Sequence, residues 1–85
     1  MKKIKVQGLD LFYDDLYLES VEFLEELGKL QSNESINMRP MMEELLGSEG
    51  YEKVKNHIKG ERKFTPQSEF SDFLTDFMEK VAAKN

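Results

Sequence analysis

The sequence contains no cysteine, only two prolines and a single histidine. Without cysteine the chain can form neither disulfide bonds nor thiolate metal sites. No continuous apolar run is long enough to span a bilayer, and the N-terminal MKKIKVQGLD lacks the apolar core of a signal peptide. We therefore expect a cytoplasmic protein that has no membrane partner.

The groups that enzymes use for catalysis are also scarce. His57 stands in a basic stretch with no neighbouring cysteine, serine or second histidine to form a nucleophile–base pair. The five glycines match neither a dinucleotide-binding turn nor a phosphate loop. The acidic residues at 14–15, 19, 22 and 25–26 lack the alternating ligands and central glycine of a calcium loop. We expect no enzymatic activity, no cofactor and no metal site.

Charge is unevenly distributed along this acidic chain, whose net charge is −5. Seven acids and no base lie between Asp10 and Glu26, whereas Lys53 to Lys63 holds five bases and one acid. The overall acidity disfavours general binding to nucleic acid, which needs Lys and Arg to displace counterions. The two segments are either solvated faces or complementary ends that join neighbouring subunits head to tail. Candidate residues for such electrostatic contacts are Glu22, Glu26, Lys55 and Lys59.

The N-terminal segment alternates apolar and charged residues on either side of Gln7-Gly8. A tight turn at these two residues would place Val6 opposite Leu9 and Ile4 opposite Leu11, so that apolar side chains match across the strands. Lys5 would then face Asp10. The pattern predicts a β-hairpin over residues 1–13.

The remainder of the chain shows helical spacing of apolar residues, with helices expected over 15–31, 40–46, 49–59 and 66–83. The start of the first of these lies somewhere between Asp15 and Ser20. Pro40 and Thr65-Pro66 are typical of helix starts, Ser48 is a candidate N-cap, and Gly47 and Gly60 are typical of helix ends. At 85 residues the chain is expected to form one domain. The predicted fold class is mainly α, a small α+β domain of about four helices behind an N-terminal hairpin.

Two apolar clusters stand out in this short chain. Phe70, Phe73, Leu74, Phe77, Met78 and Val81 recur at helical spacing, and Met41, Met42 and Leu45 form a methionine-rich group beside Pro40. Docking of the last helix on the domain's own core is the simplest interpretation. The alternative is that part of this surface serves self-assembly or partner binding, since flexible methionines can repack around varied partners. The candidate residues are Met41, Met42, Leu45, Phe70, Phe73, Phe77 and Met78.

The order of segments resembles a known family. The strand-like KIKVQGLDLFYDD is followed by the acidic SVEFLEELGKL, then by LLGSEGYEKVKNHI and a terminal FMEKVAAKN. This layout is similar to that of the small tail assembly chaperones of long-tailed bacteriophages. The resemblance covers most of the chain and rests on element order and short strings.

The resemblance implies a non-enzymatic chaperone in the host cytoplasm that self-associates and coats the long helical tape measure protein. It also implies a longer frameshifted product, sharing this N-terminal domain, through which the tail tube protein could be contacted. The alternative from the residues is a small regulatory or adaptor protein that binds a protein or DNA partner through the basic helix at 51–63.

Overall fold

A computed structural model describes residues 1–31 and 38–84 of the chain. Within these residues the chain forms a two-stranded antiparallel sheet and four helices, as the predicted α+β class requires. Residues 32–37, part of the predicted loop before Pro40, lie outside the described residues. The elements are β1 (Lys2–Val6), β2 (Leu9–Tyr13), α1 (Asp15–Leu18), α2 (Val21–Gln31), α3 (Arg39–Lys59) and α4 (Gln67–Lys84).

The β-hairpin has the predicted register, with Ile4 opposite Leu11 and all other pairs following from it. Gln7 and Gly8 both have positive φ angles, 51° and 80°, as a two-residue type I′ turn requires. The alternation of side chains then turns one face of the hairpin toward the helices. The buried residues of that face are Ile4, Val6, Leu11 and Tyr13.

The predicted helix over 15–31 is divided into α1 and α2. The carboxylate of Asp14 accepts hydrogen bonds from the first N–H groups of α1. Ser20 then ends this short helix and begins the next: its hydroxyl donates to the carbonyl of Tyr17 (2.6 Å) and accepts from the N–H of Phe23 (3.1 Å). The long helix thus begins at the late end of the predicted range, with Ser20 as its N-cap, and Asp15–Leu18 form a separate short helix instead of its first turn.

Helix α3 contains both of the helices predicted between Pro40 and Lys59, separated by a kink at Gly47. The backbone of Gly47 has φ 77° and ψ 163°, a conformation that is essentially restricted to glycine. The hydroxyl of Ser48 donates to the carboxylate of Glu43 (3.0 Å), a different contact from the helix cap that the sequence suggested.

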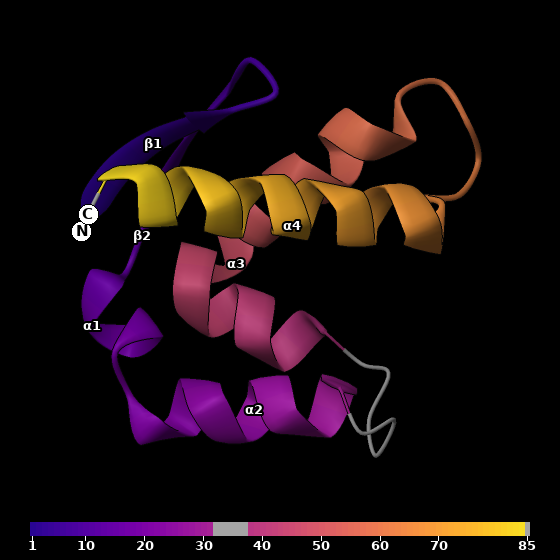
Figure 1. The fold of residues 1–85 in the computed structure, drawn as a ribbon. Helices are drawn as coiled ribbons and strands as arrows, with labels where there is room; N and C mark the ends of the chain where they lie inside the picture. Colours follow the sequence, from indigo (N-terminus) through magenta and orange to yellow (C-terminus); the bar gives the residue numbers. More distant parts are fainter. Residues whose placement is uncertain (32–37, 85) are drawn as a thin grey trace.

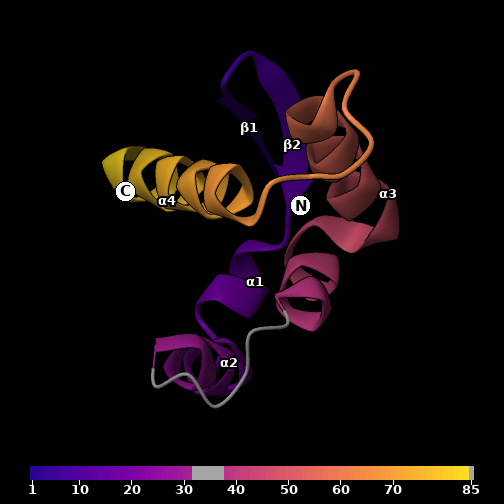
Figure 2. The same cartoon turned by 90° about the vertical axis from the view of Figure 1, so that its right-hand side faces the viewer.

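The hairpin lies between the two longest helices, with β2 packed against α3 and β1 against α4 (Figures 1 and 2). Helix α1 contacts both α3 and α2, and α2 lies at the edge of the molecule farthest from the hairpin turn. No helix within the described residues is long and apolar enough to cross a membrane.

Candidate functional site

The apolar residues proposed from the sequence as a partner surface are mostly in the core of the single chain. Six of the seven are no more than 8% exposed, and Met78 is half-buried against the same core. The assignment of the six to a binding surface is therefore corrected, because a partner could not reach them in this fold. The six are Met41, Met42, Leu45, Phe70, Phe73 and Phe77.

Aromatic contacts explain why the stripe on α4 faces inward. Phe77 meets Tyr13 of β2 edge-on, with ring centroids 5.5 Å apart. Phe73 and Phe70 meet the rings of His57 and Tyr51 of α3, at 6.1 Å and 6.0 Å. Edge-to-face pairs at such distances are favourable beyond the area they bury. The last helix is thus held by both the hairpin and α3.

Helix α2 presents three distinct faces. At 3.6 residues per turn, successive residues are rotated by about 100°, so residues three or four apart share a face. The core face carries the buried Phe23 and the half-buried Leu27. The second face is charged and is formed by Glu22, Glu25, Glu26 and Lys29. The third, which we call the outer face, is formed by Val21, Leu24 and Gly28.

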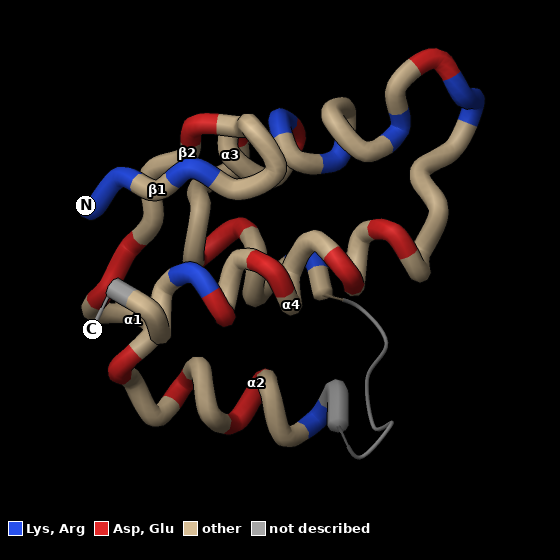
Figure 3. Tube along the Cα trace, turned by 45° about the horizontal axis from the view of Figure 1, so that its top comes forward, with Lys and Arg blue, Asp and Glu red and all other residues tan. Residues whose placement is uncertain are grey.

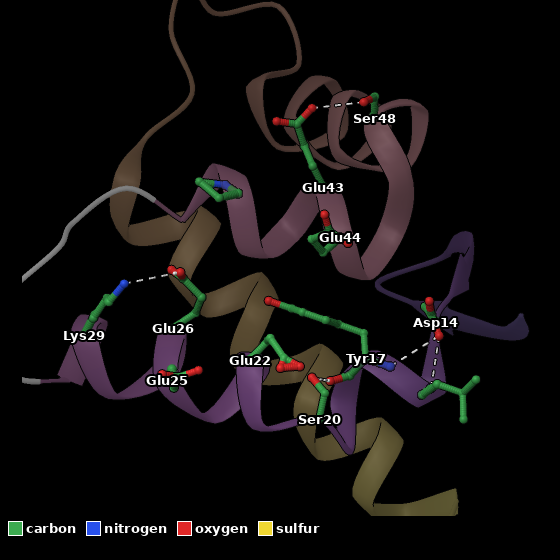
Figure 4. Close-up of a pocket in the computed structure, with 12 residues that line it drawn as sticks. Asp14, Tyr17, Ser20, Glu22, Glu25, Glu26, Lys29, Glu43, Glu44 and Ser48 are labelled. Atoms are coloured by element: carbon green, nitrogen blue, oxygen red, sulfur yellow. Dashed lines mark hydrogen bonds and ion pairs between the residues drawn. The ribbon is translucent and has the colours of Figure 1, made fainter.

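The charged face of α2 forms one wall of an open groove of about 970 Å³ (Figure 4). The first half of α3 forms the facing wall, and α1 closes one end. Six carboxylates and one ammonium group line this acidic groove, and its apolar lining comes from Leu16, Tyr17 and Pro40. The remaining lining residues are Asp14, Ser20, Glu22, Glu25, Glu26, Lys29, Glu43, Glu44 and Ser48.

Half of the groove's carboxylates are engaged within the chain. Asp14 caps α1, Glu26 lies 3.6 Å from the ammonium of Lys29, and Glu43 pairs with Arg39 at 3.0 Å. The other three, Glu22, Glu25 and Glu44, have no ion-pair partner among residues 1–31 and 38–84. They leave uncompensated negative charge along both walls.

The phenol of Tyr17 lies in this negative field. Burial raises the pKa of Tyr17 above its usual value, and the charges of Glu26, Glu44 and Glu22 raise it further. Figure 4 shows the side chain reaching across the groove among these carboxylates. The hydroxyl therefore stays protonated at neutral pH and is available as a hydrogen-bond donor.

The groove's chemistry is that of a charged binding surface. In the described part of the chain, no three carboxylate or imidazole side chains are close enough to hold one metal ion. His57, the only histidine, lies on α3, where it is exposed and packs against Phe73 of α4, and it does not line the groove. The carboxylates are thus spread along a channel, which suits an extended cationic partner more than a single ion.

The outer face of α2 is apolar and uncovered. Val21 is 66% exposed and Leu24 is 64% exposed. A Cβ atom at Gly28 would meet nothing within 4 Å, so the face is open there as well. Helical periodicity could have indicated this face from the sequence, once α2 was known to begin at Val21.

The connection between α3 and α4 carries another exposed apolar residue, which lies beside a cation. Phe64 is 74% exposed, and the ammonium of Lys63 lies 5.4 Å from the centre of its ring. Arg62 anchors the connection through two hydrogen bonds to the carboxylate of Glu69, at 2.6 and 3.1 Å. This pairing lowers the pKa of Glu69. We call residues 59–64, KGERKF, the basic loop.

The electrostatic residues proposed from the sequence fall on these two surfaces. Glu22 and Glu26 line the acidic groove, and Lys59 begins the basic loop. Lys55 is half-buried, with its ammonium 5.6 Å from the centre of the Tyr51 ring. Figure 3 shows acids along α2 and bases along the end of α3 and the basic loop, on opposite sides of the molecule. Sequence reasoning missed Glu43, Glu44 and Phe64.

Several cations of the basic helix at 51–63 already have partners within the chain. The ammonium of Lys53 donates to the carbonyl of Asp10 (2.7 Å), Arg62 pairs with Glu69, and Lys55 lies over Tyr51. The ion pair with Glu69 compensates the charge of Arg62, and the other two contacts hold their ammonium groups against the chain, so fewer cations of the helix are available to a phosphate backbone.

Comparison of the chain with protein families, with curated proteins and with solved structures finds no match.

Proposed function

We propose that the protein is a tail assembly chaperone of long-tailed bacteriophages. In this proposal it has no chemistry of its own, associates with itself, and holds the tape measure protein in the host cytoplasm until the tail tube forms around it. The observation that carries the proposal is the outer face of α2, where Val21 and Leu24 are uncovered on an otherwise acidic helix. The layout of the sequence supports the choice of family.

The outer face of α2 suits an apolar helical partner. An amphipathic helix can lay its apolar side along such a face, and each buried Val or Leu side chain contributes about 1.5–3 kcal/mol. Two such side chains give weak binding, because association itself costs several kcal/mol. A long partner bound by many copies at once would be held firmly, since linked sites raise the overall affinity.

The net charge of −5 fits this role. A protein that exposes apolar side chains remains soluble when like charges keep its copies from aggregating unspecifically. Acidic residues are also more effective than basic ones in this respect. The carboxylates around Val21 and Leu24 would therefore keep a complex with an apolar helix in solution.

Co-production with a tape measure protein from the same genome tests the proposal. We expect the tape measure protein to be recovered in the soluble fraction with the unmodified chain and to be insoluble without it. The double substitution Val21→Ser and Leu24→Ser should weaken binding by at least tenfold, because both apolar contacts are lost. Soluble yield and co-purification measure the effect.

Phe12→Ser is the matched control, because Phe12 is 58% exposed on β2, away from α2. It should leave the soluble yield unchanged, and circular dichroism should show all variants folded. A tape measure protein that stays insoluble beside the unmodified chain would contradict the proposal. So would an absence of any long helical reading frame near the gene.

A further inference from the structure

We propose that copies of this chain join head to tail, with the basic loop of one copy seated in the acidic groove of the next. Phe64 enters the groove and contacts Leu16, Tyr17 and Pro40, while Lys59 and Lys63 face its carboxylates. The inference rests on the self-association in the proposed function. It does not depend on the identity of any other partner.

Charge complementarity is the first argument for this occupant. The groove holds six carboxylates and one ammonium, and Glu22, Glu25 and Glu44 have no ion-pair partner in the described part of the chain. The basic loop supplies the ammonium groups of Lys59 and Lys63, against one acid of its own, Glu61. Complementary potentials of this kind steer association and set the orientation of the partners.

Apolar matching is the second argument. Phe64 is 74% exposed although it is one of the largest apolar side chains, and Leu16 at the groove is exposed to the same degree. Pro40 and the ring of Tyr17 widen the apolar lining. Side chains that carry most of the binding energy of an interface are typically large anchors that fill a pocket, with surrounding contacts that exclude water.

The placement of the two surfaces makes the contact intermolecular. The basic loop and α2 lie at opposite ends of the molecule in Figures 1 and 2, so a chain cannot fill its own groove. The pairing of Arg62 with Glu69 anchors the loop beside α4, next to Lys63 and the exposed Phe64. When two copies join in this way, the dimer still has one unoccupied groove and one unoccupied basic loop. Further copies can therefore add, and the assembly grows into a ring or a filament.

Two complementary variants test this geometry. The loop variant carries Lys63→Gln and Phe64→Ser, and the groove variant carries Glu22→Lys and Glu25→Lys. Each alone is expected to associate at least tenfold more weakly than the unmodified protein. Mixed in equal amounts they should form a heterodimer, because the intact loop of one fits the intact groove of the other. Assembly should stop at the heterodimer, because its only unoccupied surfaces are the substituted loop and the substituted groove.

Native mass spectrometry and light scattering give the readout. The control variant, Phe12→Ser with Lys80→Gln, makes the same kinds of change elsewhere on the surface and should assemble like the unmodified protein. The inference is overturned if either variant keeps the unmodified assembly state, or if the mixture stays monomeric or grows beyond a dimer. Each of these results leaves the binding of a tape measure protein through Val21 and Leu24 intact, so the two proposals fail separately.

Discussion

Replacing Phe77 by alanine is expected to lower the free energy of unfolding by about 3–5 kcal/mol. The side chain is fully buried and meets Tyr13 edge-on, so its removal leaves a cavity where α4 joins the hairpin. A domain of this size has a total stability of about 4–13 kcal/mol. The variant should therefore lose a large fraction of its stability. Urea denaturation followed by circular dichroism measures the change.

Leu24→Ala is the control for this result, because Leu24 is 64% exposed on the outer face of α2. Its removal should change stability by no more than about 0.5 kcal/mol. A Phe77→Ala protein that keeps the unmodified stability but loses its ability to assemble would contradict the account. It would show that the stripe on α4 is an interface after all.

Replacing Gly47 by alanine is the second change with a large expected effect. At φ 77° and ψ 163° an L-residue with a side chain is strained, at a cost of about 1–3 kcal/mol. A Cβ atom at this position would meet nothing within 4 Å, so the penalty comes from the backbone and not from a clash. The kink also allows Leu45 before it and Val54 after it to reach the same core. If α3 relaxed to a straight helix, one of its two halves would no longer reach the core.

Gly28→Ala provides a matched comparison in the same chain. Gly28 is helical, and an added Cβ atom would again meet nothing within 4 Å. Here alanine should stabilise the protein by up to about 1 kcal/mol, because it favours the helix. Thermal denaturation of both variants should therefore shift in opposite directions. Equal shifts would mean that Gly47 is not strained by a side chain.

The hairpin was predictable in detail from the sequence, because alternation, turn residues and cross-strand charges all indicated the same register. The breaks at Gly47 and Gly60 were also visible, since glycine marks positions that other residues avoid. The division at Ser20 was not predictable in the same way. The apolar spacing continues through it, and only the hydrogen bonds of its hydroxyl show that it caps α2.

The candidate site was only partly accessible from the sequence. The acidic face of α2 could be read from the spacing of Glu22, Glu25 and Glu26. The opposite wall could not, because Glu43 and Glu44 reach the groove only through the packing of α3 beside α1. The apolar clusters were visible in the sequence, but their role was not. Periodicity cannot distinguish a stripe that packs against its own chain from one that binds another, and here both clusters meet in one core.

The central claim is that this protein acts by association through its surfaces. Molar mass measured by light scattering, over a range of protein and salt concentrations, tests that claim most directly. We predict a mass that rises above the 10.0 kDa of one chain as protein concentration increases at low salt. High salt should return the mass toward that value, because screening weakens the contact between the groove and the basic loop. A mass of 10.0 kDa under every condition would contradict the account.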